Sequence, residues 1–484
     1  MTKKDLLQTH ADYDSFLPEW RFFVRSYFGG MRYSEGNYLV QHPFESSSNY
    51  ERRKDIAYYY NYCQPIVDIF VSLLFKKEPT RDFGLLTKDP LFVQFQADAD
   101  LTGNTLSQFV REAQRFAAVY GRISVIVDKP AVSVLTQAQA RDEGIRPYLT
   151  MITPENILNW RYVRLRNGRS VLDMVTVVED RDKDGKPSSI RIWDRQGWQF
   201  YVIDEKTKDG DALTPVDSGF HDLGVVPLVN IYNKNSVTRM VGLSDIEDIA
   251  GINKNIYYLC SDAQEIIENT AFPMLAMPYD KSGPEQKETG PKNIMEFDPD
   301  AANAKPYWLE APHSSLNEIR EYVSQHRRNM FQMANLLGIY ISGESVQPPA
   351  GIALEIENQQ RDAVLAEKAD NIEQAELQIL TMYALWEGKK FDGSVKYQRD
   401  FSIRDLDMNT QNIINLLQSN TVESEEFWQQ LQKKAARNLL GDLSKADRNK
   451  VYQDIEQSKK PVNTPPANNP GPAGGVNNNG GKGV

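Results

Sequence analysis

The segment Gly242-Leu-Ser-Asp-Ile-Glu-Asp-Ile-Ala-Gly-Ile-Asn-Lys-Asn-Ile-Tyr257 opens the part of the chain whose organisation is easiest to interpret. It predicts a helix over about residues 244–270, which would be roughly 40 Å long at about 1.5 Å per residue. Residues 271–311 follow as a compact insertion with several Pro and Gly and a few short apolar runs. A second helix is predicted over 315–337 and ends at Gly338. The sequence therefore predicts two long helices that are joined through a small insertion.

The chain beyond these two helices is predicted to be mainly helical. A loop rich in Gly and Pro, residues 342–351, separates them from a very long helix over 352–388. Shorter elements are predicted after it: strands over 395–401 and helices over 409–417, over 425–440 and after Ser444. Residues 461–484 have almost no apolar content and no periodicity, which predicts disorder.

The first half combines helices with strands, so the predicted fold class is α+β. An opening helical segment within residues 1–50 precedes an amphipathic helix from Ile56 to Leu74, in which Pro65 predicts a kink or break. A helix over about 105–120 stops at Gly121 and leads into a β-branched strand. Residues 147–229 then predict a single antiparallel meander, with hairpin signals at Asp184-Gly185 and Gln196-Gly197 and strands over 148–152, 171–178, 189–193, 198–203 and 225–231.

The composition is that of a globular protein with enough apolar material for several domains. The 484 residues are 25% charged and 40% hydrophobic. A net charge of −11 argues against a protein that wraps nucleic acid by neutralising phosphates, but it does not exclude a conduit in which DNA must slide. Cys63 and Cys260 are too few for a disulfide framework and are expected to be buried thiols. With no apolar signal core and no stretch long enough to span a bilayer, we expect no membrane contact and assembly in the cytoplasm.

Motifs for catalysis or metal binding are weak. Asp180-Arg-Asp-Lys-Asp-Gly185 matches the first half of a calcium loop, but Arg191 stands at the twelfth position and the flanks are strands, so a hairpin turn is preferred. There is no Walker A loop, nucleophile elbow or zinc helix, and His326 is expected to be a packed or interfacial histidine. Two pairs of carboxylates at i, i+3 spacing are expected to be solvated helix faces: Asp245 with Asp248, and Glu265 with Glu268. Three lysines of the insertion stand beside acidic residues in a mixed, solvated patch: Lys281, Lys287 and Lys292.

Several phrases, taken in order, resemble the portal proteins of tailed bacteriophages. Tyr58-Tyr-Tyr-Asn-Tyr-Cys-Gln-Pro-Ile-Val-Asp68 is similar to their early core helix, and 109–127 to the helix-to-strand step of their wing. Ile152-Thr-Pro-Glu-Asn-Ile-Leu-Asn-Trp160 and Gly224-Val-Val-Pro-Leu-Val229 resemble the segments that open and close the portal meander. The segment 242–257 resembles the entry to the stem. The resemblance covers nearly the whole ordered chain and depends on the joint order of these phrases.

This resemblance implies a portal-type fold with an α/β wing, a helical stem, a small clip and a helical crown. The implied boundaries are wing 1–243, stem 244–270, clip 271–311, stem 312–338, tunnel loop 339–351, wing 352–405, crown 406–460 and a disordered tail 461–484. The implied tunnel loop would contact DNA through Ser342, Glu344, Ser345 and Gln347. The clip lysines would contact the connector or terminase.

The implied assembly is a dodecameric ring in the virion, at one capsid vertex, with no cofactor, metal or enzymatic activity. Its partners would be the major capsid protein, the terminase large subunit, a head–tail connector or adaptor protein, and double-stranded DNA bound without sequence specificity. Two alternatives stay open from the residues alone. One is another virion structural or connector protein, and the other is a metal-dependent phage nuclease.

Overall fold

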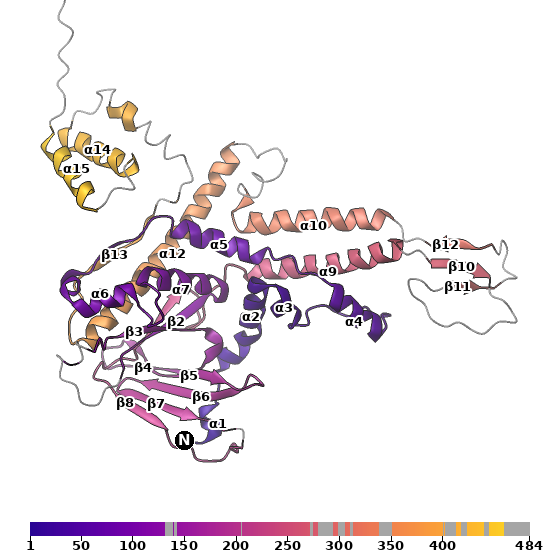
Figure 1. Cartoon of the computed structure of the whole chain (residues 1–484), viewed down its shortest axis with the longest axis horizontal. Helices are drawn as coiled ribbons and strands as arrows, with labels where there is room; N and C mark the ends of the chain where they lie inside the picture. The colour runs from indigo at the N-terminus through magenta and orange to yellow at the C-terminus, as the bar shows by residue number, and fades with distance from the viewer. Residues whose placement is uncertain are drawn as a thin grey trace, which may run out of the picture. The chain divides into compact units, whose positions relative to one another are not determined.

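The computed structural model describes residues 1–130, 139, 143–204, 206–271, 274–278, 294–298, 305–309, 313–337, 351–399, 401, 413–417, 424–439 and 445–458. It divides into two compact units, Met1–Phe401 and Ser402–Val484. The first unit mixes helices with sheets, in agreement with the predicted α+β class (Figure 1). No described helix is long and apolar enough to cross a membrane.

The chain begins with five helices: α1 (Lys3–Leu6), α2 (Ala11–Phe28), α3 (Gly30–Ser34), α4 (Ser47–Ile56) and α5 (Cys63–Leu74). The side chain of Ser46 caps α4 by accepting a hydrogen bond from the Asn49 amide. The expected helix from Ile56 to Leu74 is wrong in its first part, because the chain leaves α4 after Ile56 and re-enters a helix only at Cys63. Pro65 therefore stands in the first turn of α5, where its missing amide hydrogen costs no hydrogen bond.

A three-stranded sheet forms the centre of the first unit, in the order β3-β2-β9. Its strands are β2 (Arg122–Asp128), β3 (Tyr148–Ile152) and β9 (Leu228–Tyr232). Every residue of β2 is buried, since α7 (Leu106–Tyr120) packs on this sheet together with α12 (Gly351–Trp386). A capping box between Thr105 and Gln108 starts α7, and Gly121 in the left-handed conformation ends it. The predicted helix-to-strand step at this glycine is confirmed.

A five-stranded antiparallel meander, β4-β5-β6-β7-β8, forms the second sheet. Its strands are β4 (Ile157–Arg164), β5 (Ser170–Arg181), β6 (Pro187–Asp194), β7 (Gly197–Val202) and β8 (Asp217–Phe220). The turn at Asp184-Gly185 is confirmed, with one carboxylate oxygen of Asp182 accepting the amides of Asp184 (2.9 Å) and Lys186 (2.8 Å). The turn at Gln196-Gly197 is also confirmed.

The single meander predicted over residues 147–229 is wrong at both of its ends. The strands expected over 148–152 and 225–231 correspond to β3 and β9, which both pair with β2 in the central sheet. The prediction also lacked β4 and β8, the two edge strands of the actual meander. Pairing partners more than 100 residues apart, such as Ser124 and Asn230, leave no local signal in the sequence.

Smaller elements complete the first unit. The strand β1 (Thr80–Asp82) pairs with β13 (Ser394–Lys396), so the strand predicted over 395–401 is real but shorter. The 3₁₀ helix η1 (Gly84–Lys88) and the helix α6 (Pro90–Ala97) lie between β1 and α7. In the second unit, α14 (Glu425–Leu439) and α15 (Lys445–Gln457) pack together, and Trp428 and Leu431 belong to their small core. The tail predicted over 461–484 lies outside the described residues.

Candidate functional site

Two long helices, α9 (Glu247–Ala271) and α10 (His313–Met333), lie side by side and run in opposite directions (Figure 1). Three short strands lie at their far end: β10 (Met274–Pro278), β11 (Ile294–Phe297) and β12 (Tyr307–Leu309). The strand β10 is central, parallel to β11 and antiparallel to β12. The helices predicted over 244–270 and 315–337 are confirmed, and the insertion between them contains a small sheet.

The segment just before α9 is fixed to the body of the unit by a buried ion pair. Lys368 of α12 binds Asp245, and the two side chains are only 1% and 2% exposed. The same carboxylate accepts a hydrogen bond from Asn233 (2.9 Å) and lies 3.5 Å from the ammonium of Lys234. Burial alone would raise the pKa of Asp245, but the two lysines hold that pKa below its ordinary value. Asp245 is therefore a structural tie between α12 and the start of α9.

The middle of α9 is fixed to the N-terminal helices. Asn253 is fully buried and bonds the backbone at the start of α5: it donates to the Tyr60 carbonyl (3.0 Å) and accepts from the Tyr62 amide (3.2 Å). The nitrogen and the oxygen of this buried side-chain amide both have hydrogen-bond partners, so the contact fixes one orientation of the helix.

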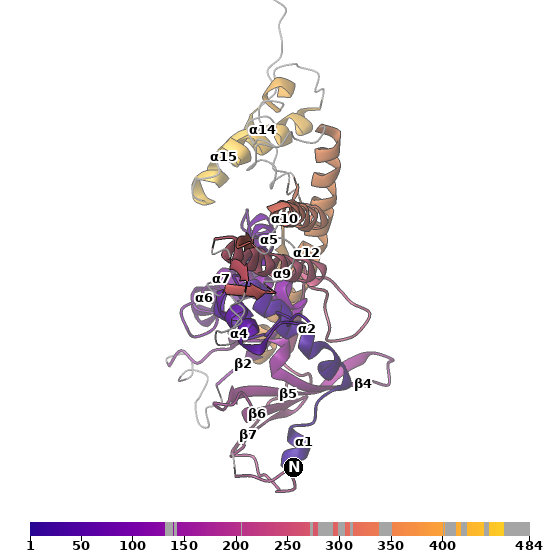
Figure 2. The same ribbon diagram turned by 90° about the vertical axis from the view of Figure 1, so that its right-hand side faces the viewer.

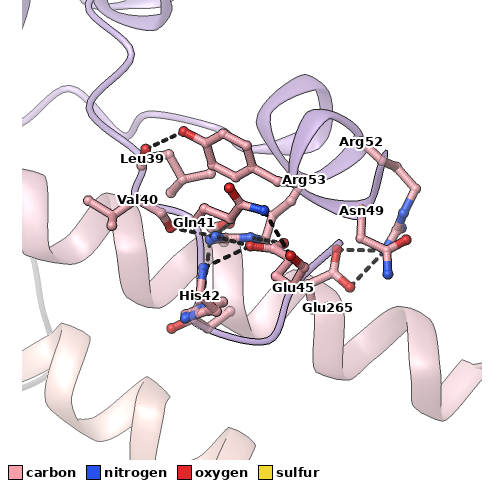
Figure 3. A network of polar contacts seen from close by, with 12 residues as sticks. Leu39, Val40, Gln41, His42, Glu45, Asn49, Arg52, Arg53 and Glu265 are labelled. Atoms are coloured by element: carbon pink, nitrogen blue, oxygen red, sulfur yellow. Dashed lines mark hydrogen bonds and ion pairs between the residues drawn. The ribbon is translucent and has the colours of Figure 1, made fainter. Parts of the chain in front are cut away.

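Two consecutive arginines of α4 fix the distal half of α9 (Figure 3). Arg52 binds both Glu265, at 2.7 Å, and Glu268. Arg53 is buried and forms a two-bond pair with Glu45 (2.8 and 2.9 Å). Its guanidinium also donates to Ser261 of α9 (3.3 Å) and to the carbonyl of Val40 (2.6 Å). The hydrogen bonds from Arg53 lower the pKa of Glu45, so the pair stays charged at neutral pH.

The expectation that both carboxylate pairs are solvated helix faces is wrong for three of the four residues. Asp245 precedes α9 and is buried against Lys368, while Glu265 and Glu268 share the guanidinium of Arg52. The cations come from segments more than 120 residues away in the sequence, so no spacing rule could pair them. Sequence reasoning missed Arg52, Arg53, Asn253 and Lys368 for the same reason.

The residues predicted to contact DNA and partner proteins are not part of this arrangement. Ser342, Glu344, Ser345, Gln347 and the lysines Lys281, Lys287 and Lys292 all lie outside the described residues. His326, expected to be packed or interfacial, is half-buried on α10 with its ring 4.4 Å from that of Tyr322. Cys63 is buried as expected, whereas Cys260 is only half-buried.

Within the described part of the chain, no group of three or more His, Cys, Asp or Glu could hold a metal ion. An open cavity of about 730 Å³ lies between α7 and β3, with Asp100, Arg111, Glu112 and Arg115 among its lining residues. Arg115 is already paired with Glu112 and with Asp68, and the Asp100 carboxylate accepts from the Asn104 side chain at 2.8 Å. Arg115, Glu112 and Asp100 thus already have partners within the protein.

Comparison with known proteins gives one family and several remote structural likenesses. Residues 245–387 match a domain of unknown function, DUF4055. This match runs from Asp245 to the residue after α12 and so includes both helices of the pair. No curated protein matches the chain.

The solved structures with similarity to this chain include components of gene transfer agent (GTA) particles. One comes from the neck of an empty GTA particle computed with C6 symmetry, with 11% identity and a TM-score of 0.43, over 76% of this chain and 89% of that one. Another comes from the neck of a native GTA particle computed with C12 symmetry, with 12% identity and a TM-score of 0.42, over 88% and 94%. A third, from the virion of the native particle, has 12% identity and a TM-score of 0.41, over 78% and 89%. All three likenesses are remote.

Proposed function

We propose that this chain is the portal subunit of a tailed bacteriophage or a phage-like particle. The observation that supports the proposal is the antiparallel pair α9 and α10, with a small sheet at its far end and the long helix α12 after it. In this proposal the pair is the stem, residues 271–311 are the clip, and 339–351 are the tunnel loop. Residues 1–243 with 352–405 are the wing, and 406–460 are the crown.

The surface of the stem suits a subunit of a ring. Three large apolar side chains of α9 and α10 are about half exposed: Ile267 (45%), Tyr322 (52%) and Met333 (49%). A helical pair that carries such side chains gains free energy when a neighbouring surface covers them. Cyclic closure supplies that neighbour, because each subunit contributes one surface to the subunit before it and another to the subunit after it.

The proposed ring has twelve subunits, stands at one vertex of the capsid and performs no covalent chemistry. Double-stranded DNA would pass through it during packaging and ejection, contacting Ser342, Glu344, Ser345 and Gln347. The clip, with Lys281, Lys287 and Lys292, would contact the terminase large subunit and then the head–tail connector. The wing would face the major capsid protein.

Light scattering together with negative-stain microscopy of the purified full chain tests this proposal. We expect a ring of about a dozen subunits with a central hole and a mass of about 660 kDa, from a subunit mass of 55.2 kDa. The substitution Tyr322→Glu places a charge on the surface of the stem and should weaken assembly of the ring. Phe220→Glu, at an exposed aromatic residue at the end of β8, is the matched control.

A monomer or dimer at high protein concentration would contradict the ring. The nuclease alternative makes a different prediction, namely magnesium- or manganese-dependent cleavage of plasmid DNA. Turnover that rises with enzyme concentration and is abolished by a chelator would contradict a purely structural function.

A further inference from the structure

The hairpin that joins β4 and β5 is unusually basic for this chain. Arg161-Tyr-Val-Arg-Leu-Arg-Asn-Gly-Arg169 contains four arginines in nine residues and no acidic residue, although the whole chain has a net charge of −11. Surfaces usually intersperse both signs, because neighbouring like charges repel one another. A local excess of arginine in an acidic protein therefore calls for a functional explanation.

Hydrogen bonds within the hairpin hold its backbone in one conformation. Arg164 ends β4 opposite Ser170, the first residue of β5. The Leu165 amide donates to the Arg169 carbonyl (2.8 Å), and the Gly168 amide donates to the Leu165 carbonyl (2.9 Å). Gly168 has a φ of 82°, which a tight turn followed by a bulge requires. Figure 2 shows the hairpin extending outward beside the label β4.

Among the residues that the structure describes, only one of the four arginines of the hairpin is neutralised by a carboxylate. Arg161 binds the carboxylate of Asp173 at 2.7 and 3.0 Å. Arg164, Arg166 and Arg169 are exposed, and within the described part of the chain none of them forms an ion pair. A Cβ placed on Gly168 would lie 4.0 Å from a terminal nitrogen of Arg164, so that guanidinium lies beside the turn.

A further arginine joins them from a distant segment. Arg239 donates to the Ser170 hydroxyl (2.6 Å), and its guanidinium lies 5.0 Å above the ring of Tyr162. It too is exposed and has no ion pair among the residues that the structure describes. Arg164, Arg166, Arg169 and Arg239 are called the arginine patch below.

The chemistry of the arginine patch favours a phosphate backbone as its ligand. A guanidinium is always charged near neutral pH, and its planar fork of donors matches the oxygens of a phosphate. Protein interfaces are usually organised around buried aromatic or apolar anchors. One aromatic ring at this patch, that of Tyr162, is half-buried beneath Arg239. Binding to this surface would thus be electrostatic.

We propose that the arginine patch binds the phosphodiester backbone of nucleic acid, without sequence readout and away from residues 339–351. This proposal does not depend on ring formation, because it needs only the hairpin and Arg239. It gives an acidic chain a local basic contact for a polyanion, which otherwise would be repelled.

Fluorescence anisotropy of the full chain with a labelled 30-base-pair DNA duplex tests the proposal. Arg166→Gln with Arg169→Gln removes two charges at the turn, while Lys76→Gln with Lys77→Gln removes two exposed charges elsewhere. Each phosphate contact contributes about −0.9 to the slope of log K against log salt, so the arginine variant should flatten that slope by roughly 2. We also expect its binding to be at least roughly tenfold weaker at moderate salt, with little change for the lysine variant.

The proposal is overturned if the two double variants bind the duplex equally well, or if poly-L-glutamate competes as effectively as unlabelled duplex. The second result would identify an acidic protein as the ligand instead. Single-stranded DNA of the same length distinguishes duplex from general backbone binding, and either form supports a phosphate site. Light scattering of each variant reports ring formation separately. The variant Arg239→Gln tests the arginine patch without changing the sequence of the hairpin.

Discussion

Replacing Lys368 by methionine tests whether the buried ion pair with Asp245 stabilises the start of α9. The change keeps the length of the side chain but leaves a carboxylate that is 2% exposed, with Lys234 and Asn233 as its remaining partners in the described part of the chain. Removing one partner of a buried ion pair costs about 3–5 kcal/mol. The lost contact of the ammonium over the ring of Phe70, now at 4.5 Å, adds up to about 1 kcal/mol. We therefore expect the free energy of unfolding to fall by about 4 kcal/mol.

Urea denaturation followed by tryptophan fluorescence measures this loss, read as a shift of the midpoint at an unchanged slope. Lys54→Met is the matched control, because Lys54 pairs with an exposed glutamate and its replacement should shift the midpoint much less. Adding Asp245→Asn to Lys368→Met should recover about 2–3 kcal/mol, because the uncompensated charge is then gone. The stabilising role of the pair would be refuted if Lys368→Met and Lys54→Met lowered the free energy of unfolding equally. It would also be refuted if the effects of Lys368→Met and Asp245→Asn simply added in the double variant.

The same pair predicts a dependence on pH with a definite sign. In the native chain the lowered pKa of Asp245 contributes stability above its ordinary pKa of about 3.9, and this is lost as the pH falls toward the lowered value. In Lys368→Met, burial dominates and raises that pKa, so the folded variant binds a proton more readily than the unfolded chain does. The destabilisation caused by Lys368→Met should therefore shrink between pH 7 and pH 5.

Two other predictions concern two glycines, Gly242 and Gly251, and the buried His221. Denaturation measures the free energy of unfolding of each variant. Gly242→Ala would place a Cβ 2.0 Å from the Gly121 carbonyl oxygen and should lower the free energy of unfolding by about 2–3 kcal/mol. Gly251 lies inside α9 with open space around it, so Gly251→Ala should raise the free energy of unfolding by about 0.5–1 kcal/mol. Burial lowers the pKa of His221 against the opposing effect of Asp194, so stability should fall as the pH drops below about 6.5. His221→Phe should remove that fall, and an unchanged pH profile would contradict it.

The elements that the sequence predicted well are those with strong local patterns. The helices α9, α10 and α12 begin and end within about four residues of their predicted bounds, since a helical repeat over 20 or more residues leaves little ambiguity. The hairpin turns at Asp184-Gly185 and Gln196-Gly197 were also predicted correctly, because the conformation of a turn depends on a few adjacent residues.

The features that escaped prediction depend on contacts between distant segments. The strand Leu228–Tyr232 has the composition of any buried strand, and only the folded chain shows that it pairs with β2 instead of closing the meander. Asp245 and Asp248 have the same spacing as an exposed helical pair, yet the first of them is buried by a lysine 123 residues further along. The arginines at 164–169 stand in the sequence, but only the structure shows that none of them pairs with a carboxylate among the described residues.

The contacts along α9 imply that the N-terminal helices set the direction of this helix. Asn253 holds the start of α5, and Arg52 and Arg53 of α4 hold α9 from Ser261 to Glu268, which leaves only its last residues beyond these contacts. A helix fixed at several points along its length behaves as a rigid lever, because bending it would break buried hydrogen bonds and ion pairs at once. Small displacements of α4 would thus be transmitted to β10–β12 at the far end of the pair. In the proposed ring the angle of each α9–α10 pair must fit that of its neighbours, so Arg52 and Arg53 would influence ring geometry.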